Sequence, residues 1–158
     1  GQAEDAAQTF QAILGEDPAH AGAYGGLVRA LIALDNLDEA EATLNGAPAK
    51  IAETPELEAA FAQLELAKQA QNAGPLGDLQ AALEADPNNH KARLDYAQAL
   101  YAGGQAEAVD ELLDLFGRDR DWNDGAAKGQ LFTIFDALKP NDPIVLNGRR
   151  KLSSMIFA

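Results

Sequence analysis

The side chains in this sequence best suited to chemistry are two histidines, His20 and His90, each just after an Asp-Pro dipeptide. A histidine pair could bind a metal or provide a general base, but both roles need further ligands or partners close by. The two histidines lie in separate segments, with no third ligand clustered beside either. We therefore predict that both are turn residues where helices begin. We expect no enzyme activity, no metal and no other cofactor.

Three further motifs have structural explanations. Gly103-Gly104 lacks the preceding strand and the following Lys-Ser/Thr of a phosphate loop, so it predicts a turn between helices. The acidic pairs Asp38-Glu39 and Asp110-Glu111 are expected on solvated helix faces.

The sequence has no cysteine, which excludes disulfides, thiolate catalysis and cysteine-ligated zinc within these residues and is compatible with a cytoplasmic location.

Charge is distributed unevenly along the chain, which has a net charge of −13 over 158 residues. Residues 1–117 contain 5 Lys/Arg and 20 Asp/Glu, a net charge of −15, whereas residues 118–158 contain 7 Lys/Arg and 5 Asp/Glu, a net charge of +2. An acidic body repels nucleic acid. No apolar run approaches the ~20 residues that span a bilayer. We therefore expect protein partners, and neither nucleic acid nor a membrane.

One helical phrase occurs twice, 69 residues apart. The first copy contains Asp17-Pro18 and Leu31, and the second contains Asp86-Pro87 and Leu100. Half of this spacing is close to the period of about 34 residues found in helix–turn–helix repeats. Together with apolar residues at helical spacing, it predicts an all-α superhelix of about nine helices. Such stacks present an extended surface that binds other proteins.

The sequence divides into a repeating and a non-repeating region. Residues 1–117 are expected to hold the repeats, with the first repeat truncated at its N-terminal side and a degenerate unit over residues 55–86. Residues 118–158 depart from the pattern, as terminal repeats usually do. They contain a charged connector, which Trp122 is expected to anchor, and a capping helix pair with a tail. Asp142 followed by proline predicts the start of the last helix.

The apolar positions of the best unit, Tyr24, Leu27, Leu31, Ala40 and Leu44, resemble those of the tetratricopeptide repeat. The resemblance implies stacked helix pairs in which the first helix of each pair lines a concave groove. In this register the groove is expected to bind proteins through Arg29, Ile32, Lys91, Leu94, Gln98 and Tyr101. An ordinary solvated helix face is the alternative. Glycines and a leucine occupy places where the family's terminal-carboxylate clamps carry lysine and asparagine, which favours apolar contacts instead.

The C-terminal region has a more specific resemblance. The connector at residues 118–122, the Asn141-Asp142-Pro143 turn and the run from Arg149 to Leu152 are similar to the C-terminal half of bacterial thioredoxin-fused tetratricopeptide co-chaperones, the chaperedoxin family. The resemblance implies a cytoplasmic module that holds unfolding client proteins and docks on a GroEL-type chaperonin. It also implies that a thioredoxin-like domain precedes residue 1 in the natural protein, so any redox role lies outside these residues.

The final helix is the sharpest candidate for chaperonin docking. Its cations and last apolar residues are expected to contact the partner: Arg149, Arg150, Lys151, Ile156 and Phe157. The alternative is a capping helix whose apolar side packs on residues 131–138, and we favour packing for Leu152 and Met155. Two other functions stay open, a scaffold for another protein complex and the regulatory domain of an enzyme whose catalytic part is absent. The sequence does not indicate the clients, the affinity or the oligomeric state.

Overall fold

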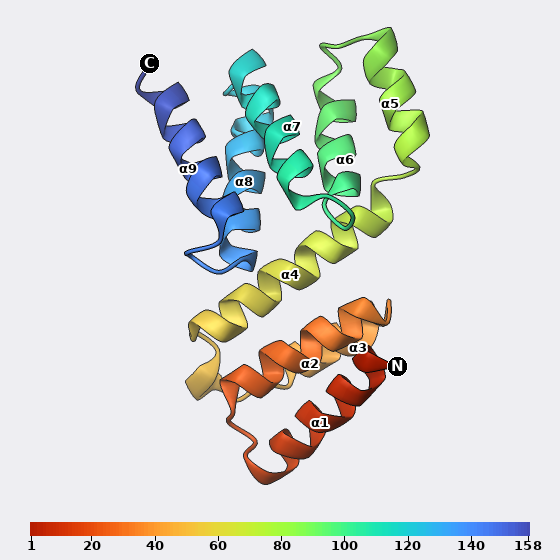
Figure 1. The fold of residues 1–158 in the computed structure, drawn as a ribbon, viewed down its shortest axis with the longest axis vertical. Helices are drawn as coiled ribbons and strands as arrows, with labels where there is room; N and C mark the ends of the chain where they lie inside the picture. The colour runs from red at the N-terminus through yellow and green to blue at the C-terminus, as the bar shows by residue number, and fades with distance from the viewer. The chain divides into compact units, whose positions relative to one another are not determined.

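The computed structural model describes all residues from 1 to 158 and is entirely helical (Figure 1). Its elements are α1 (Gln2–Glu16), α2 (Ala21–Ala33), α3 (Leu37–Asn45), the 3-10 helix η1 (Ala49–Ile51), α4 (Pro55–Asn72), α5 (Leu76–Ala85), α6 (His90–Leu100), α7 (Gln105–Arg118), the 3-10 helix η2 (Trp122–Asp124), α8 (Ala126–Ala137) and α9 (Pro143–Ile156). The prediction of an all-α chain with about nine helices is confirmed. No helix combines the length and the apolar character needed to cross a membrane.

The chain divides into two compact units, residues 1–67 and residues 68–158. The boundary falls inside α4, so this one helix contributes to both units. This division by packing is separate from the division into repeats at 1–117 and a capping pair at 118–158, which stays a prediction.

In residues 1–67, α1 packs on α2 and α2 packs on α3. Phe10 of α1 lies against Gly26 of α2, where an added Cβ would overlap the phenylalanine ring. The core consists of small and branched apolar side chains: Ala7, Leu27, Val28, Ala30, Leu31, Leu37, Ala40, Leu44, Ile51, Leu57, Ala60 and Leu64. Four of the five positions that suggested the repeat are in this core, and Tyr24 packs against it.

The two copies of the repeated phrase begin their helices with the same hydrogen bond. His20 Nδ1 accepts from the N–H of Ala23 at 3.0 Å, and Asn89 Oδ1 accepts from the N–H of Ala92 at 3.0 Å. These N-caps satisfy backbone donors that have no partner inside the helix. His90 is the first residue of α6 and not its cap. The prediction that both histidines lie where helices begin is confirmed.

The aspartate that precedes the proline also has the same role in both copies. Asp17 and Asp86 each accept a hydrogen bond from the backbone N–H two residues later, at 3.2 and 3.0 Å. Both are extended, as expected for a residue before proline. The similarity ends at the next turn, where Asp35 has a left-handed φ of 57° and the corresponding Gly104 has a φ of −164°.

In residues 68–158, α5 packs on α6, α6 packs on α7, and α7 packs on both α8 and α9. The last helix packs closely, because Phe135 of α8 faces Gly148, where an added Cβ would lie 2.7 Å from the ring. Leu152 is buried and Met155 is half-buried, with its Cε near Gly117 of α7. The packing expected for Leu152 and Met155 is therefore confirmed, and α9 packs instead of projecting.

Candidate functional site

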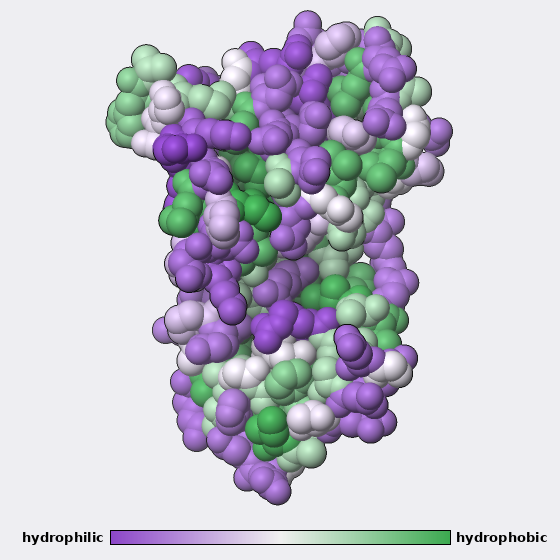
Figure 2. Space-filling model, viewed as in Figure 1, coloured by the Kyte–Doolittle hydropathy of each residue, from purple (hydrophilic) through white to green (hydrophobic).

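Helix α9 ends in two apolar residues that are at least partly exposed. Its start is fixed by Asp142, whose carboxylate accepts from the N–H of Ile144 at 2.9 Å, with a proline at the first helical position. At the other end, Ile156 is half-buried and Phe157 is 84% exposed. Figure 2 shows hydrophobic residues gathered at the C-terminal end of α9, at the upper left, beside strongly hydrophilic ones. Two of the predicted binding residues are therefore available to a partner.

The three predicted cations of α9 have different surroundings. The guanidinium of Arg149 lies over the ring of Phe135, 5.0 Å from its centroid. Arg150 Nη2 donates to Asn147 Oδ1 at 3.4 Å. Lys151 alone has a carboxylate within reach, that of Asp110 of α7, at 3.5 Å, and such an exposed pair contributes little to stability. Two uncompensated positive charges therefore lie on the last helix.

The connector holds the end of α9 through Arg120. Its Nη2 donates to the main-chain oxygen of Met155 at 3.2 Å, and its guanidinium lies over the ring of Phe116, 5.0 Å from the centroid. The sequence predicts that Arg120 lies in a charged connector but indicates no role for it. The contact joins residues 35 positions apart, and no spacing in the sequence indicates it.

The connector is anchored at Trp122, as the sequence predicted. The indole meets the imidazole of His90 edge to face, with the ring centroids 5.8 Å apart. His90 Nε2 lies 4.0 Å from Asp119 Oδ2. Nowhere in the chain do three His, Cys, Asp or Glu side chains gather as a metal site requires.

A left-handed turn leads from the connector into α8. Asn123, Asp124 and Gly125 have φ angles of 50°, 56° and 77° in succession. Glycine adopts this conformation without steric cost, and asparagine and aspartate tolerate it better than other residues do. The turn forms one wall of a pocket.

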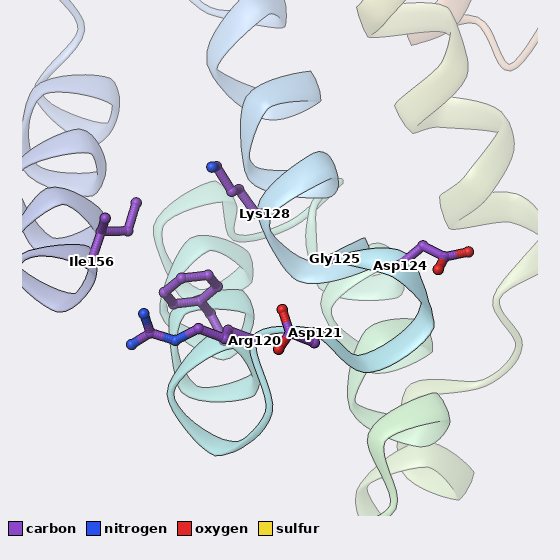
Figure 3. A pocket seen from close by; sticks show the side chains of 7 residues that line it. Arg120, Asp121, Asp124, Gly125, Lys128 and Ile156 are labelled. Carbon is purple, nitrogen blue, oxygen red and sulfur yellow. The ribbon is translucent and has the colours of Figure 1, made fainter.

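This pocket, which we call the end pocket, is open and has a volume of ≈ 430 Å³ (Figure 3). It is lined by Phe116, Arg120, Asp121, Asp124, Gly125, Lys128 and Ile156. Lys128 Nζ is 5.7 Å from the centroid of the Phe132 ring, which is itself partly exposed. Ile156 is the only lining residue that the sequence analysis proposed for binding.

The groove residues predicted on α6 are partly tied to their neighbours. Lys91 forms a salt bridge of 2.6 Å with Asp95, and Leu94 is half-buried. Gln98 Nε2 donates to Gln130 Oε1 at 3.4 Å, and Gln130 Nε2 donates to Gln69 Oε1 at 2.6 Å. One glutamine from each of α4, α6 and α8 therefore joins a chain of amides, of which the sequence analysis named only Gln98.

Tyr101, the last predicted groove residue on this side, is held largely in its neutral form. Burial raises the pKa of Tyr101 to about 12, and the negative charge of Asp142 contributes in the same direction. A hydrogen bond with the side chain of Gln105 opposes the shift. The phenol is therefore close enough to Asp142, the residue that caps α9, for its charge to act on it.

The two groove residues predicted on α2 differ in how exposed they are. Arg29 is exposed and has no carboxylate within salt-bridge distance, and its Nη1 would lie 3.3 Å from a Cβ added at Gly25. Ile32 is half-buried and packs against the core of residues 1–67. Arg29 is therefore the more accessible of the two.

Comparison with known proteins identifies repeats in both parts of the chain. Two family models, both described as tetratricopeptide repeat, match residues 1–64 and residues 69–157. No curated protein matches the sequence. Among solved structures, the chain is similar to a domain of protein VP0806 (unknown function) from Vibrio parahaemolyticus, with 23% identity, coverage of 97% of this chain and 91% of that chain, and a TM-score of 0.46.

Proposed function

Because the chain belongs to the tetratricopeptide repeat family, we propose that it is a protein-binding module that docks on its partner through the C-terminal end of α9. The observation that carries this proposal is the 84% exposure of Phe157 at the end of a helix whose Val145, Gly148 and Leu152 are buried. Burying a phenylalanine side chain contributes about 1.5–3 kcal/mol, so Phe157 is a strong anchor for a partner with an apolar pocket. Aromatic residues are also enriched among those that dominate binding energy.

The positive charges that precede Phe157 on α9 indicate what kind of surface the partner has. Arg149 and Arg150 have no carboxylate within salt-bridge distance, and both precede the apolar end of the same helix. Cations at the rim of an interface select a partner of opposite charge and speed its association. The partner surface that fits is an apolar pocket with acidic residues at its edge.

We name a GroEL-type chaperonin as the partner, on the resemblance of residues 118–158 to the thioredoxin-fused co-chaperones. In this role the module holds unfolding clients along the first helices of its repeats and docks through α9. The client-binding residues are Arg29 and Ile32 in residues 1–67, and Lys91, Leu94, Gln98 and Tyr101 in residues 68–158. Such a module works in the cytoplasm and does no covalent chemistry of its own.

The test is a binding assay with purified GroEL-type chaperonin and the chain carrying Phe157→Glu. A negative charge in place of the aromatic anchor is expected to weaken binding at least tenfold, as for a dominant interface residue. Leu146→Glu is the matched control, because Leu146 is 55% exposed on the same helix but lies in its first turn. Point substitution is preferable to deleting residues 153–158, which would also remove Met155 and its hydrogen bond with Arg120.

Equal binding by the Phe157→Glu variant and the unaltered chain would contradict docking through α9. If the unaltered chain does not bind the purified chaperonin, the partner assignment is wrong, and the surface would then belong to a scaffold for another complex or to a regulatory domain.

A further inference from the structure

We infer that Asn45 is a site of spontaneous modification, at which the chain converts its own asparagine to isoaspartate and aspartate. Asn45 is the last residue of α3, and Gly46 follows it as the C-cap. Both residues are exposed. This modification goes beyond the proposed docking through α9 and does not depend on it.

The reaction needs only the chain itself and water. The main-chain nitrogen of Gly46 attacks Cγ of the Asn45 side chain and forms a new C–N bond. The attacking nitrogen loses its proton, the side-chain amide gains one, and ammonia leaves. Water then opens the cyclic succinimide at either carbonyl, which yields isoaspartate or aspartate. Glycine suits this step, because it has no Cβ to obstruct the attacking nitrogen.

The position of Gly46 in the fold makes its nitrogen accessible. The Gly46 N–H donates to the main-chain oxygen of Ala42 at 3.1 Å, and this bond must open before the nitrogen attacks. It is the terminal bond of a nine-residue helix, and such bonds fray at little cost in free energy. A Cβ added at Gly46 would meet only the main-chain oxygens of Ala42 and Thr43 within 4 Å. No side chain of another element therefore covers this end of α3.

A second Asn-Gly pair, Asn147-Gly148, is protected by the fold. It lies inside α9, and Gly148 is buried. A Cβ added at Gly148 would lie 2.7 Å from the Phe135 ring, so this part of the helix is closely packed. Its nitrogen is released only when the middle of α9 opens, which costs more free energy than fraying of a helix end. The same dipeptide therefore gives one reactive and one protected asparagine.

The modification changes the end of α3 in two ways. Either product places a negative charge beside the last carbonyls of the helix, where the partial charge is already negative. Isoaspartate also lengthens the main chain next to Leu44, which is 2% exposed and belongs to the core of residues 1–67. We therefore expect urea to unfold the modified chain more easily than the unmodified one, and equal stability of the two would contradict this consequence.

The experiment incubates the 158-residue chain at mildly alkaline pH and follows both asparagines by peptide mapping with mass spectrometry. We expect Asn45 to react at least about tenfold faster than Asn147, because the two helix openings differ in free energy. An isoaspartyl methyltransferase should label the Asn45 product. In concentrated urea the two asparagines should react at similar rates, since both precede glycine and neither is then protected.

Gly46→Ala is the deciding variant. Gly46 has a φ of −85°, which alanine adopts without strain, and its added Cβ makes no contact shorter than 3.4 Å. The Cβ obstructs the attacking nitrogen, so conversion of Asn45 should slow about tenfold. Gly15→Ala is the matched control, because Gly15 is an exposed helical glycine with nothing within 4 Å of an added Cβ. It should leave the conversion rate unchanged.

Three results would overturn the inference. The first is equal conversion rates of Asn45 and Asn147 in the folded chain. The second is equal conversion rates of Asn45 in the Gly46→Ala variant and in the unaltered chain. The third is formation of aspartate at Asn45 without isoaspartate, which would assign the change to direct hydrolysis of the side chain.

Discussion

The guanidinium of Arg120 donates from Nη2 to the main-chain oxygen of Met155 at 3.2 Å and so joins the connector to the last turn of α9. Carbonyls in a last turn have no partner inside the helix, and a cation there stabilises it by about 0.3–1 kcal/mol. We predict that Arg120→Ala speeds hydrogen exchange of the Phe157 amide, which bonds to Ser153. Arg150→Ala on the same helix is the control, and unchanged exchange in Arg120→Ala would contradict the role of this contact.

Arg93 is predicted to be the most sensitive charged position in residues 68–158. It is only 8% exposed, and its Nη1 lies 2.7 Å from Glu111 Oε2 and 3.0 Å from Asp114 Oδ2. Arg93→Met removes the cation from Glu111, whereas Asp114 keeps Arg118 at 2.7 Å, so we expect a loss of about 1–3 kcal/mol in the free energy of unfolding. Urea unfolding measures it.

Lys91→Met is the matched control for Arg93. Lys91 lies on the same helix, its side chain is 71% exposed, and it forms one surface salt bridge with Asp95. Its replacement should change stability by less than about 1 kcal/mol. A similar loss in the Arg93 and Lys91 variants would show that the buried network is not the cause.

The raised pKa of Tyr101 predicts that the folded chain loses stability at alkaline pH. Burial raises the pKa of its phenol to about 12 from the ordinary 10.0, so the folded chain keeps a proton that the unfolded chain releases. The stabilisation is complete below about pH 10 and is lost as the pH rises from about 10 towards 12. Urea unfolding at about pH 8 and about pH 11 should show a steeper loss in the unaltered chain than in Tyr101→Phe. Parallel losses would contradict the assignment.

The helix boundaries could be predicted because their signals act over a few residues. Thr54 Oγ1 accepts from the N–H of Leu57 at 3.4 Å, and Asp142 Oδ1 accepts from the N–H of Ile144 at 2.9 Å. Proline and side-chain caps have these effects whatever the rest of the chain does. Boundaries are therefore a local property that the sequence displays directly.

The candidate site was less predictable because its contacts join distant segments. Arg120 meets Met155 across 35 residues, and Gln130 meets Gln69 across 61 residues. Neither separation follows from the repeat period or from a helical face. The left-handed turn at residues 123–125 also depends on tertiary packing, since nothing local requires three positive φ angles in succession.

The matched N-caps provide a test of the repeated phrase itself. His20 and Asn89 each accept from the backbone N–H three residues later, both at 3.0 Å. We predict that His20→Ala and Asn89→Ala each cost about 1 kcal/mol, the usual value for a lost cap. His20→Asn should retain stability, because asparagine makes this bond in the second copy. Hydrogen exchange of the Ala23 and Ala92 amides locates each effect, and unchanged exchange in the alanine variants would show that these bonds do not fix the helix starts.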